Sequence, residues 1–244
     1  MGKYIDLFKN LTFTDEEKDR EKEDFEKYIK LKGTYLHQWI YDIIDSIDGK
    51  VSYKEISQVI SYDKYIRNVL YRYLSAYEEQ LRSELFNKLE YDDTIENILN
   101  KKIDNSKIVF KQDDSKSNFY FASFNKYFTF GKLIDIIKLH REIFEIEATD
   151  AELLKIADLR NKVMHHNLLL ISYYKTTKEI DNNIKDIENA ISLLWRFLDY
   201  HFREAFTYNI NNGNFKKGDS SNGANLDRFC LGVFKDGIFN KKEN

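Results

Sequence analysis

The chain has 244 residues, of which 42% are hydrophobic and 32% are charged, so it suits one large domain with a soluble surface. Its formal net charge of −3 excludes a globally basic nucleic-acid binder. Proline is absent, and this composition favours long uninterrupted helices because proline removes an amide donor and clashes with the preceding turn. Cys230 is the single cysteine, which excludes an intrachain disulfide and fits a reducing compartment.

The first residues, Met1 to Ile5, lack the apolar core of a signal peptide. No run of about 18 apolar residues occurs anywhere, so no membrane span is expected. We therefore expect a cytoplasmic protein that does not contact the membrane.

Apolar residues that recur every three or four positions predict helices in the first half of the chain. These helices cover residues 12–32, 36–47 and 62–89. The first has a narrow stripe of Phe25, Tyr28 and Ile29 and ends at Gly33. The third has the clearest periodicity, with Glu78, Glu79 and Arg82 on its polar face.

Residues 91–118 are rich in Asp, Asn, Ser and Lys and predict a loop-rich insertion, with a short strand at 108–110. Residues 101–141 contain nine lysines and arginines against four aspartates. A local basic surface can attract phosphates even on a slightly acidic protein. The candidate RNA-binding residues are Lys101, Lys102, Lys107 and Lys111. The simpler expectation is a solvated loop and helix face.

Three more helices are expected in the second half, over residues 131–144, 150–166 and 180–208. The last has a core face that includes Trp195, Leu198 and Phe202. Residues 209–225 are rich in Asn, Gly and Ser and predict a mobile linker, after which residues 226–239 could fold back as a small helix or strand.

The sum is an all-α fold, a multi-helix bundle. We expect an N-terminal helical extension over 1–24, a main helical domain over 25–208, and a flexible linker and tail over 209–244.

The residues with the most distinctive chemistry run from Arg160 to His165. Asn161 and His165 are four apart on a helix and share a face, which Asp158 joins. Arg160 is displaced by one residue, but its long side chain can swing toward that face. An arginine and a histidine at this spacing also occur by chance in many helices, so the spacing alone favours a structural role.

These side chains suit cleavage of RNA without a metal. The imidazole of His165 titrates near neutral pH and can act as an acid or base. The guanidinium of Arg160 offers a planar fork of donors to phosphate oxygens, and Asn161 can hold the imidazole or a phosphate. Attack of a ribose 2′-OH on its own phosphodiester needs these functions and spares DNA. One histidine performs only half of the proton transfers well, so two copies facing across a homodimer would complete the site.

Three neighbouring residues are supporting candidates. His166 adds a polar group at the helix end, where histidines also interact with the helix dipole. Glu78 and Arg82 are four apart on the long helix. The simpler expectation for them is a surface ion pair, and the alternative is that they support the site.

The run Arg160-Asn161-x-x-x-His165 resembles the R-x(4–6)-H motif of HEPN-domain ribonucleases. Its surroundings, from Leu159 to Asn167 with a second histidine, resemble Abi-like abortive-infection proteins of the AbiD/AbiF type. Residues 71–83, 128–133 and 31–39 are similar to that family in style, and the resemblance covers roughly residues 25–205. Residues 167–170 depart from the family, because they are mostly apolar where many relatives have an arginine and an aromatic-Asn pair.

The resemblance implies a HEPN-like helical bundle, usually dimeric, with metal-independent endoribonuclease activity and no cofactor. It implies an antiphage toxin of an abortive-infection or toxin–antitoxin system, and a small noncoding RNA as a candidate antitoxin. His165 would be the acid/base, Arg160 the phosphate clamp and Asn161 the positioning group.

Two alternatives remain open. One is a non-catalytic RNA-binding module that uses Arg160, the basic segment and exposed tyrosines. The other is a helical interaction protein that senses a phage component. A metal-dependent enzyme is the least favoured, because no His/Cys/Asp cluster has ligand spacing.

Overall fold

The computed structural model describes residues 7, 10–13, 18–48, 51–88, 129–144, 146–165, 168–171, 176–213 and 224–234. The regular elements in these ranges are helices, accompanied by an isolated β-bridge between Thr12 and Ser52. The helices are α2 (Lys18–Lys32), α3 (Thr34–Asp48), α4 (Tyr53–Lys88), α7 (Phe130–Leu139), α8 (Arg141–Phe144), α9 (Asp150–Met164), α10 (Thr177–Phe197), α11 (Tyr200–Asn211) and α12 (Ala224–Phe229). The predicted all-α class is confirmed.

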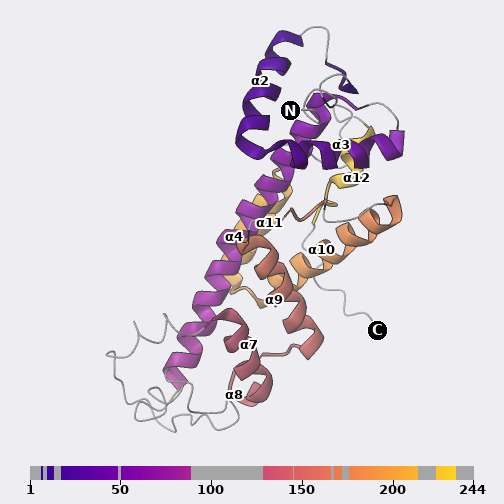
Figure 1. Cartoon of the computed structure of the whole chain (residues 1–244). Helices are drawn as coiled ribbons and strands as arrows, with labels where there is room; N and C mark the ends of the chain where they lie inside the picture. Colours follow the sequence, from indigo (N-terminus) through magenta and orange to yellow (C-terminus); the bar gives the residue numbers. More distant parts are fainter. Residues whose placement is uncertain are drawn as a thin grey trace.

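The long helix α4 is the axis of the molecule (Figure 1). It begins at Tyr53, earlier than the predicted residue 62, because Ser52 and Glu55 cap its N-terminus reciprocally. The Ser52 backbone N–H donates to the Glu55 carboxylate at 2.9 Å, and the Glu55 N–H donates to the Ser52 hydroxyl at 3.2 Å. These bonds satisfy amides that the first turn of a helix leaves without partners.

The other helices are arranged along α4. Helices α7, α9 and α11 pack against it, α10 packs on α9, and α2 and α3 lie at its N-terminal end (Figure 1). The α4 stripe supplies much of the core, including Ile66, Leu70, Leu74 and Leu81. Tyr28 was predicted to join the α2 stripe but is 40% exposed, because that stripe continues through Phe25 and Ile29 instead.

The predicted helix over 180–208 is wrong in its continuity, because the chain breaks into α10 and α11. Leu198 is extended, with ψ of 143°, and Asp199 caps α11 by accepting from the His201 N–H at 2.9 Å. Arg203 of α11 donates to two carbonyls at the end of α10, those of Leu198 at 3.0 Å and Arg196 at 2.8 Å. The guanidinium thus replaces amide donors that a continuous helix would have supplied.

The break also changes which side chains are buried. Phe202, predicted in the core, is exposed on α11, while Leu198 is buried as expected. The helix predicted over 131–144 is likewise interrupted at His140, which caps α7 before the short α8. The apolar residues Leu133, Ile134, Ile137 and Phe144 of these two helices are buried.

Part of the C-terminal segment belongs to the core. Phe229, Cys230, Leu231 and Phe234 are buried, and the Leu231 N–H donates to the Tyr62 hydroxyl at 3.2 Å. Residues 224–234 therefore pack in the bundle and do not behave as the expected flexible tail, although the small helix expected there is present as α12. The expected domain boundary after residue 24 falls inside the continuous helix α2.

The expected insertion at 91–118, with its strand at 108–110, lies outside the described residues. Within the described ranges, no helix is both long and apolar enough to cross a bilayer.

Candidate functional site

Helix α9 presents the residues from Arg160 to His165. Thr149 and Glu152 form a capping box at its start, with the Thr149 N–H donating to the Glu152 carboxylate at 2.8 Å. The buried face of α9 consists of Leu153, Ile156, Leu159 and Val163. This stripe fixes the rotation of the helix, so Arg160 is half-buried and Asn161 is exposed.

Helix α9 ends at Met164, and His165 is its C-terminal cap. The His165 N–H still donates to the Asn161 carbonyl at 3.0 Å, which ties the two residues that share a face. The imidazole is exposed and makes no hydrogen bond to the described part of the chain. Asn161 and His165 therefore present their side chains outward from one end of α9.

Arg160 points to a different side, toward α4 and α7. Its Nε and Nη2 donate to one oxygen of the Glu78 carboxylate, at 3.1 and 3.0 Å. Its guanidinium also lies over the ring of Phe130, 5.6 Å from the centroid. Among the described residues, no hydrogen bond links Arg160 to Asn161 or His165.

Glu78 joins two arginines. One of its carboxylate oxygens accepts from Arg160, and the other accepts from Arg82 on the next turn of α4. Glu78 is nearly buried, so this is not the surface ion pair that the spacing alone suggested. The structure thus brings Glu78, Arg82 and Arg160 into one charged cluster with two cations and one anion. Counted alone, these three side chains carry one net positive charge.

The segment after the motif is held by two buried polar side chains that the sequence reasoning missed. The Asp63 carboxylate accepts from the N–H groups of Leu169 and Leu170, at 2.7 and 3.0 Å. The amide of Asn183 donates to the Leu169 carbonyl at 2.7 Å. Side chains of α4 and α10 thereby hold the backbone just beyond α9 by hydrogen bonds.

The sequence does contain an indication of the hydrogen bond made by Asn183. Asn183 interrupts the apolar face of α10 between Ile180 and Ile184, and a polar residue on an apolar face usually has a hydrogen-bond partner. The side chains of this segment are apolar because they also contribute to the core. Leu169 and Leu170 are fully buried, so that segment serves packing.

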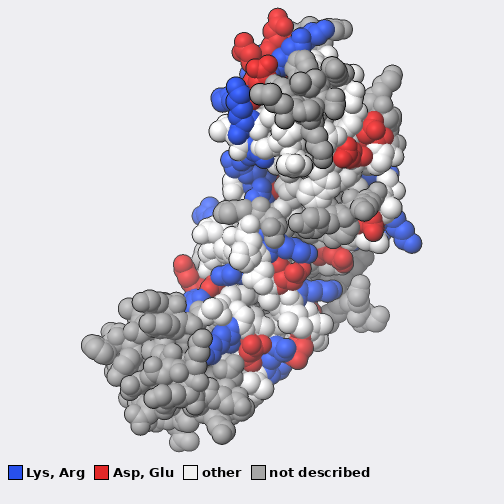
Figure 2. Space-filling model, viewed as in Figure 1, with Lys and Arg blue, Asp and Glu red and all other residues white. Residues whose placement is uncertain are grey.

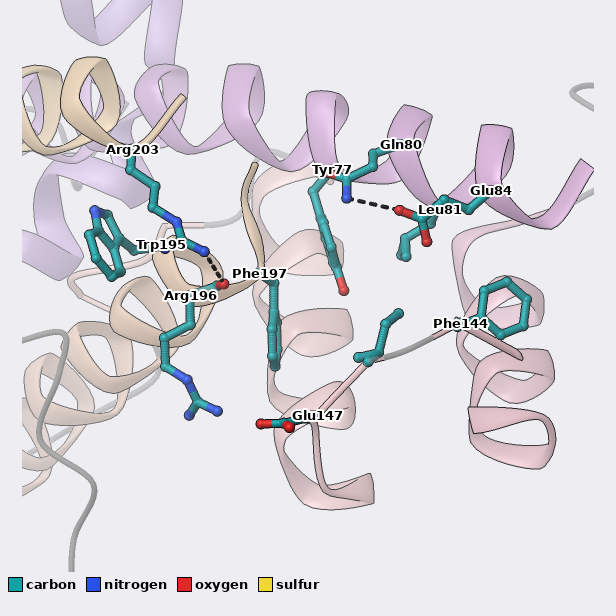
Figure 3. A pocket seen from close by; sticks show the side chains of 11 residues that line it. Tyr77, Gln80, Leu81, Glu84, Phe144, Glu147, Trp195, Arg196, Phe197 and Arg203 are labelled. Carbon is teal, nitrogen blue, oxygen red and sulfur yellow. Dashed lines mark hydrogen bonds between the residues drawn. The ribbon is translucent and has the colours of Figure 1, made fainter. Parts of the chain in front are cut away.

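Two hollows among the described residues lie near this part of the fold, and neither is lined by Glu78, Arg82 or Arg160. The larger, about 520 Å³, lies between α4, α8 and the α10–α11 corner, with Tyr77, Phe144 and Phe197 around it (Figure 3). None of Arg160, Asn161 and His165 lines it. The other, about 460 Å³, is a groove between α9 and α10 that includes Asp158, Lys162 and the exposed Leu154. This groove borders the exposed face of α9.

Some predicted residues lie outside the described part of the chain, namely His166, Lys101, Lys102, Lys107 and Lys111. Asp158, which shares the α9 face, pairs with Lys162 at 2.8 Å. In the described ranges, no group of three or more His, Cys, Asp or Glu side chains could hold a metal ion.

No family model, curated protein or solved structure matches this chain.

Proposed function

We propose that this protein is a metal-independent endoribonuclease of the HEPN type, built on Arg160, Asn161 and His165. The observation that carries the proposal is the arrangement at the end of α9. Asn161 and His165 are exposed on one face, and Arg160 is held by Glu78 and Phe130 on the adjoining side of the same helix. The resemblance of the motif to HEPN ribonucleases supports the same assignment.

The reaction is an internal transfer of the phosphodiester. The ribose 2′-oxygen forms a bond to phosphorus, and the bond from phosphorus to the 5′-oxygen breaks, which leaves a 2′,3′-cyclic phosphate and a 5′-hydroxyl. His165 takes the 2′-OH proton or gives a proton to the leaving oxygen. Arg160 donates to the phosphoryl oxygens as negative charge develops on them. Two of its five donors are engaged by Glu78, which leaves three, both on Nη1 and one on Nη2, for a phosphate.

A homodimer would place two such half-sites together. The groove between α9 and α10 has an apolar floor next to the motif, and Leu154 at its edge is 53% exposed. A twofold axis beside α9 would cover this leucine and bring one His165 to each side of the RNA. We propose that the protein acts as an antiphage toxin in an abortive-infection or toxin–antitoxin system, with a small noncoding RNA as a candidate inhibitor.

The test is cleavage of a mixed RNA pool in EDTA, with mapping of the product ends. The wild-type protein should leave 2′,3′-cyclic phosphates, and Arg160→Ala and His165→Ala should each abolish cleavage. Matched controls are Arg196→Ala, which removes an exposed arginine of α10 that pairs with Glu152 of α9, and His201→Ala on α11. Unchanged cleavage by His165→Ala overturns the assignment.

The contact between Arg160 and Glu78 favours a second candidate, a non-catalytic RNA-binding module. A guanidinium that already has a carboxylate partner can hold a phosphate without assisting a reaction at it. This module would bind RNA with strong salt sensitivity and without turnover. Cleaved product under single-turnover conditions excludes it.

A further inference from the structure

The exposed face of α4 is the surface whose chemistry the candidate site does not use. At about 100° per residue, Lys64, Tyr71 and Arg82 lie within ~20° of one another around this helix, and Arg72 lies ~80° to one side of Lys64. Tyr53 and Ser57 continue this line toward the N-terminus of α4, where Tyr53 is buried and Ser57 is half-buried. The face therefore runs straight from the N-terminal end of α4 to Arg82, which shares Glu78 with Arg160.

Helix α2 covers only the first turns of this face. The ring of Phe25 packs edge-on against Tyr53, with centroids 5.2 Å apart. Beyond that contact the α4 face is open, and Lys64, Tyr71 and Arg72 are exposed. The C-terminal end of α2, where the chain turns into α3, thus lies beside the point where the open face of α4 begins (Figure 1).

Glu21 and Asp24 of α2 lie near Tyr53, but cations predominate on the rest of this surface. Between Lys64 and Tyr77 the sequence has three cations and no acid, and the adjacent Asp63 is buried against Arg67 and backbone amides. Between Lys27 and Tyr41 there are three lysines and no acid. Figure 2 shows blue Lys and Arg side chains following the edge of the molecule from α2 down to α4. Glu79 is the first exposed acid further along α4.

Large apolar side chains stand among these cations. Tyr71 is 50% exposed on α4, and Leu31 and Tyr35 are 67% and 77% exposed at the α2–α3 corner. Aromatic rings interleaved with lysines match a single-stranded nucleic acid, because bases stack on the rings while phosphates meet the cations. A duplex hides its bases inside the stack and would use the charges only.

We propose that this surface is a track that binds single-stranded RNA. It begins at Tyr28, Leu31 and Tyr35 and continues along Lys64, Tyr71 and Arg72 of α4. The track leads to the Glu78–Arg82–Arg160 cluster. Lys64 and Arg82 are ~27 Å apart along the axis at 1.5 Å per residue, a length that several nucleotides of extended strand cover. The proposal rests on RNA being the ligand of the α9 site, and it adds where the strand approaches that site.

The track is tested by binding in the full-length His165→Ala protein, in which cleavage is removed. Fluorescence anisotropy measures the affinity for single-stranded RNA of about 4 and about 12 nucleotides. Lys64→Glu combined with Arg72→Glu should weaken binding of the longer strand by about 30-fold. The same pair should flatten the salt dependence, by ~0.7 in log–log slope for each phosphate that is no longer neutralised. Tyr71→Ser should weaken binding by about 5- to 10-fold.

The matched control reverses two exposed lysines on α10, Lys178→Glu with Lys185→Glu, which changes the net charge equally. This control should alter affinity by less than about twofold, since its charges lie away from the track. Equal losses in the track and control variants overturn the proposal, as does unchanged RNA affinity in the track variants. The proposal is also overturned if the protein binds anionic phosphatidylserine vesicles through these residues and does not bind RNA.

The two proposals fail separately. If the track variants lose RNA but Arg160→Ala and His165→Ala still cleave it, the track stands and the assigned site is wrong. If cleavage depends on Arg160 and His165 while the track variants bind normally, the strand approaches by another surface. The milder pair Lys64→Gln and Arg72→Gln, with far-UV circular dichroism, separates an effect on RNA binding from a folding defect.

Discussion

Glu78 of α4 holds Arg160 of α9 across 82 positions of sequence, with one carboxylate oxygen 3.0 Å from the Arg160 Nη2. Its other oxygen binds Arg82, so a single buried anion is shared by two half-buried cations. Removing this anion costs more than the loss of one hydrogen bond, because Arg160 then lies in partly desolvated surroundings without the carboxylate that held it.

We expect Glu78→Gln to lower the free energy of unfolding by about 1–3 kcal/mol. RNA cleavage should also fall, by about tenfold, because the amide no longer fixes the direction of the Arg160 guanidinium. Chemical denaturation and initial cleavage rates measure the two effects. Glu79→Gln is the control, since its side chain is exposed one position along the same helix. Equal behaviour of the two variants contradicts a role for Glu78.

Asp63 should be among the most sensitive positions in the chain. Asp63→Ala leaves the buried N–H groups of Leu169 and Leu170 without an acceptor, and each buried unsatisfied donor costs about 1–3 kcal/mol. Two such donors cost about 2–6 kcal/mol, so we expect the melting temperature to fall by about 4–24 °C, at roughly 2–4 °C per kcal/mol for a chain of this size. Asp181→Ala, an exposed acid on α10, should melt within about a degree of the wild type. A small shift of the melting temperature for Asp63→Ala would mean that the hydrogen bonds to residues 169–170 contribute little to stability.

The sequence predicted the elements whose signal is local. Buried stripes at helical spacing located α4 and α9, because each helix buries one continuous face against its neighbours. The break at Leu198 was not predicted, since apolar residues continue at helical spacing from α10 into α11. What ends α10 is a side chain further along, Arg203, whose guanidinium satisfies the freed carbonyls.

The site divides in the same way. The shared face of Asn161 and His165 follows from their spacing on one helix, so the sequence sufficed to pair them. The partner of Arg160 could not be read from spacing, because Glu78 reaches it through the packing of α4 on α9. Glu78 is followed directly by the exposed Glu79, so the local sequence does not indicate which of the two glutamates is buried.

Leu154→Glu should separate the proposed homodimer. This leucine is 53% exposed beside the α9–α10 groove, and a carboxylate buried in an apolar interface destabilises it. We expect a shift from dimer to monomer in light scattering coupled to gel filtration, together with loss of RNA cleavage. Leu139→Glu on α7 is the matched control, because that leucine is also 53% exposed. A wild-type protein that is already monomeric and active contradicts the two-chain site.

His37 should make folding stability depend on pH. It is buried, its Nδ1–H donates to the Gly33 carbonyl at 3.0 Å, and its ring lies between Phe25 and Tyr53. Burial lowers the pKa of His37 below its ordinary value of 6.5, although the bond to Gly33 opposes this. The unfolded chain therefore binds the proton more tightly than the folded one.

Because of that difference, the contribution of His37 to stability is complete above pH 6.5 and is lost as pH falls through the lowered folded pKa. His37→Phe removes the titrating group while keeping a ring between α2 and α4. In urea titrations at pH 5, 6 and 7.5, wild-type stability should fall toward pH 5 more steeply than that of His37→Phe. The exposed His201→Phe variant should keep the wild-type slope, and parallel curves for wild type and His37→Phe would show that His37 binds its proton equally in the folded and unfolded states.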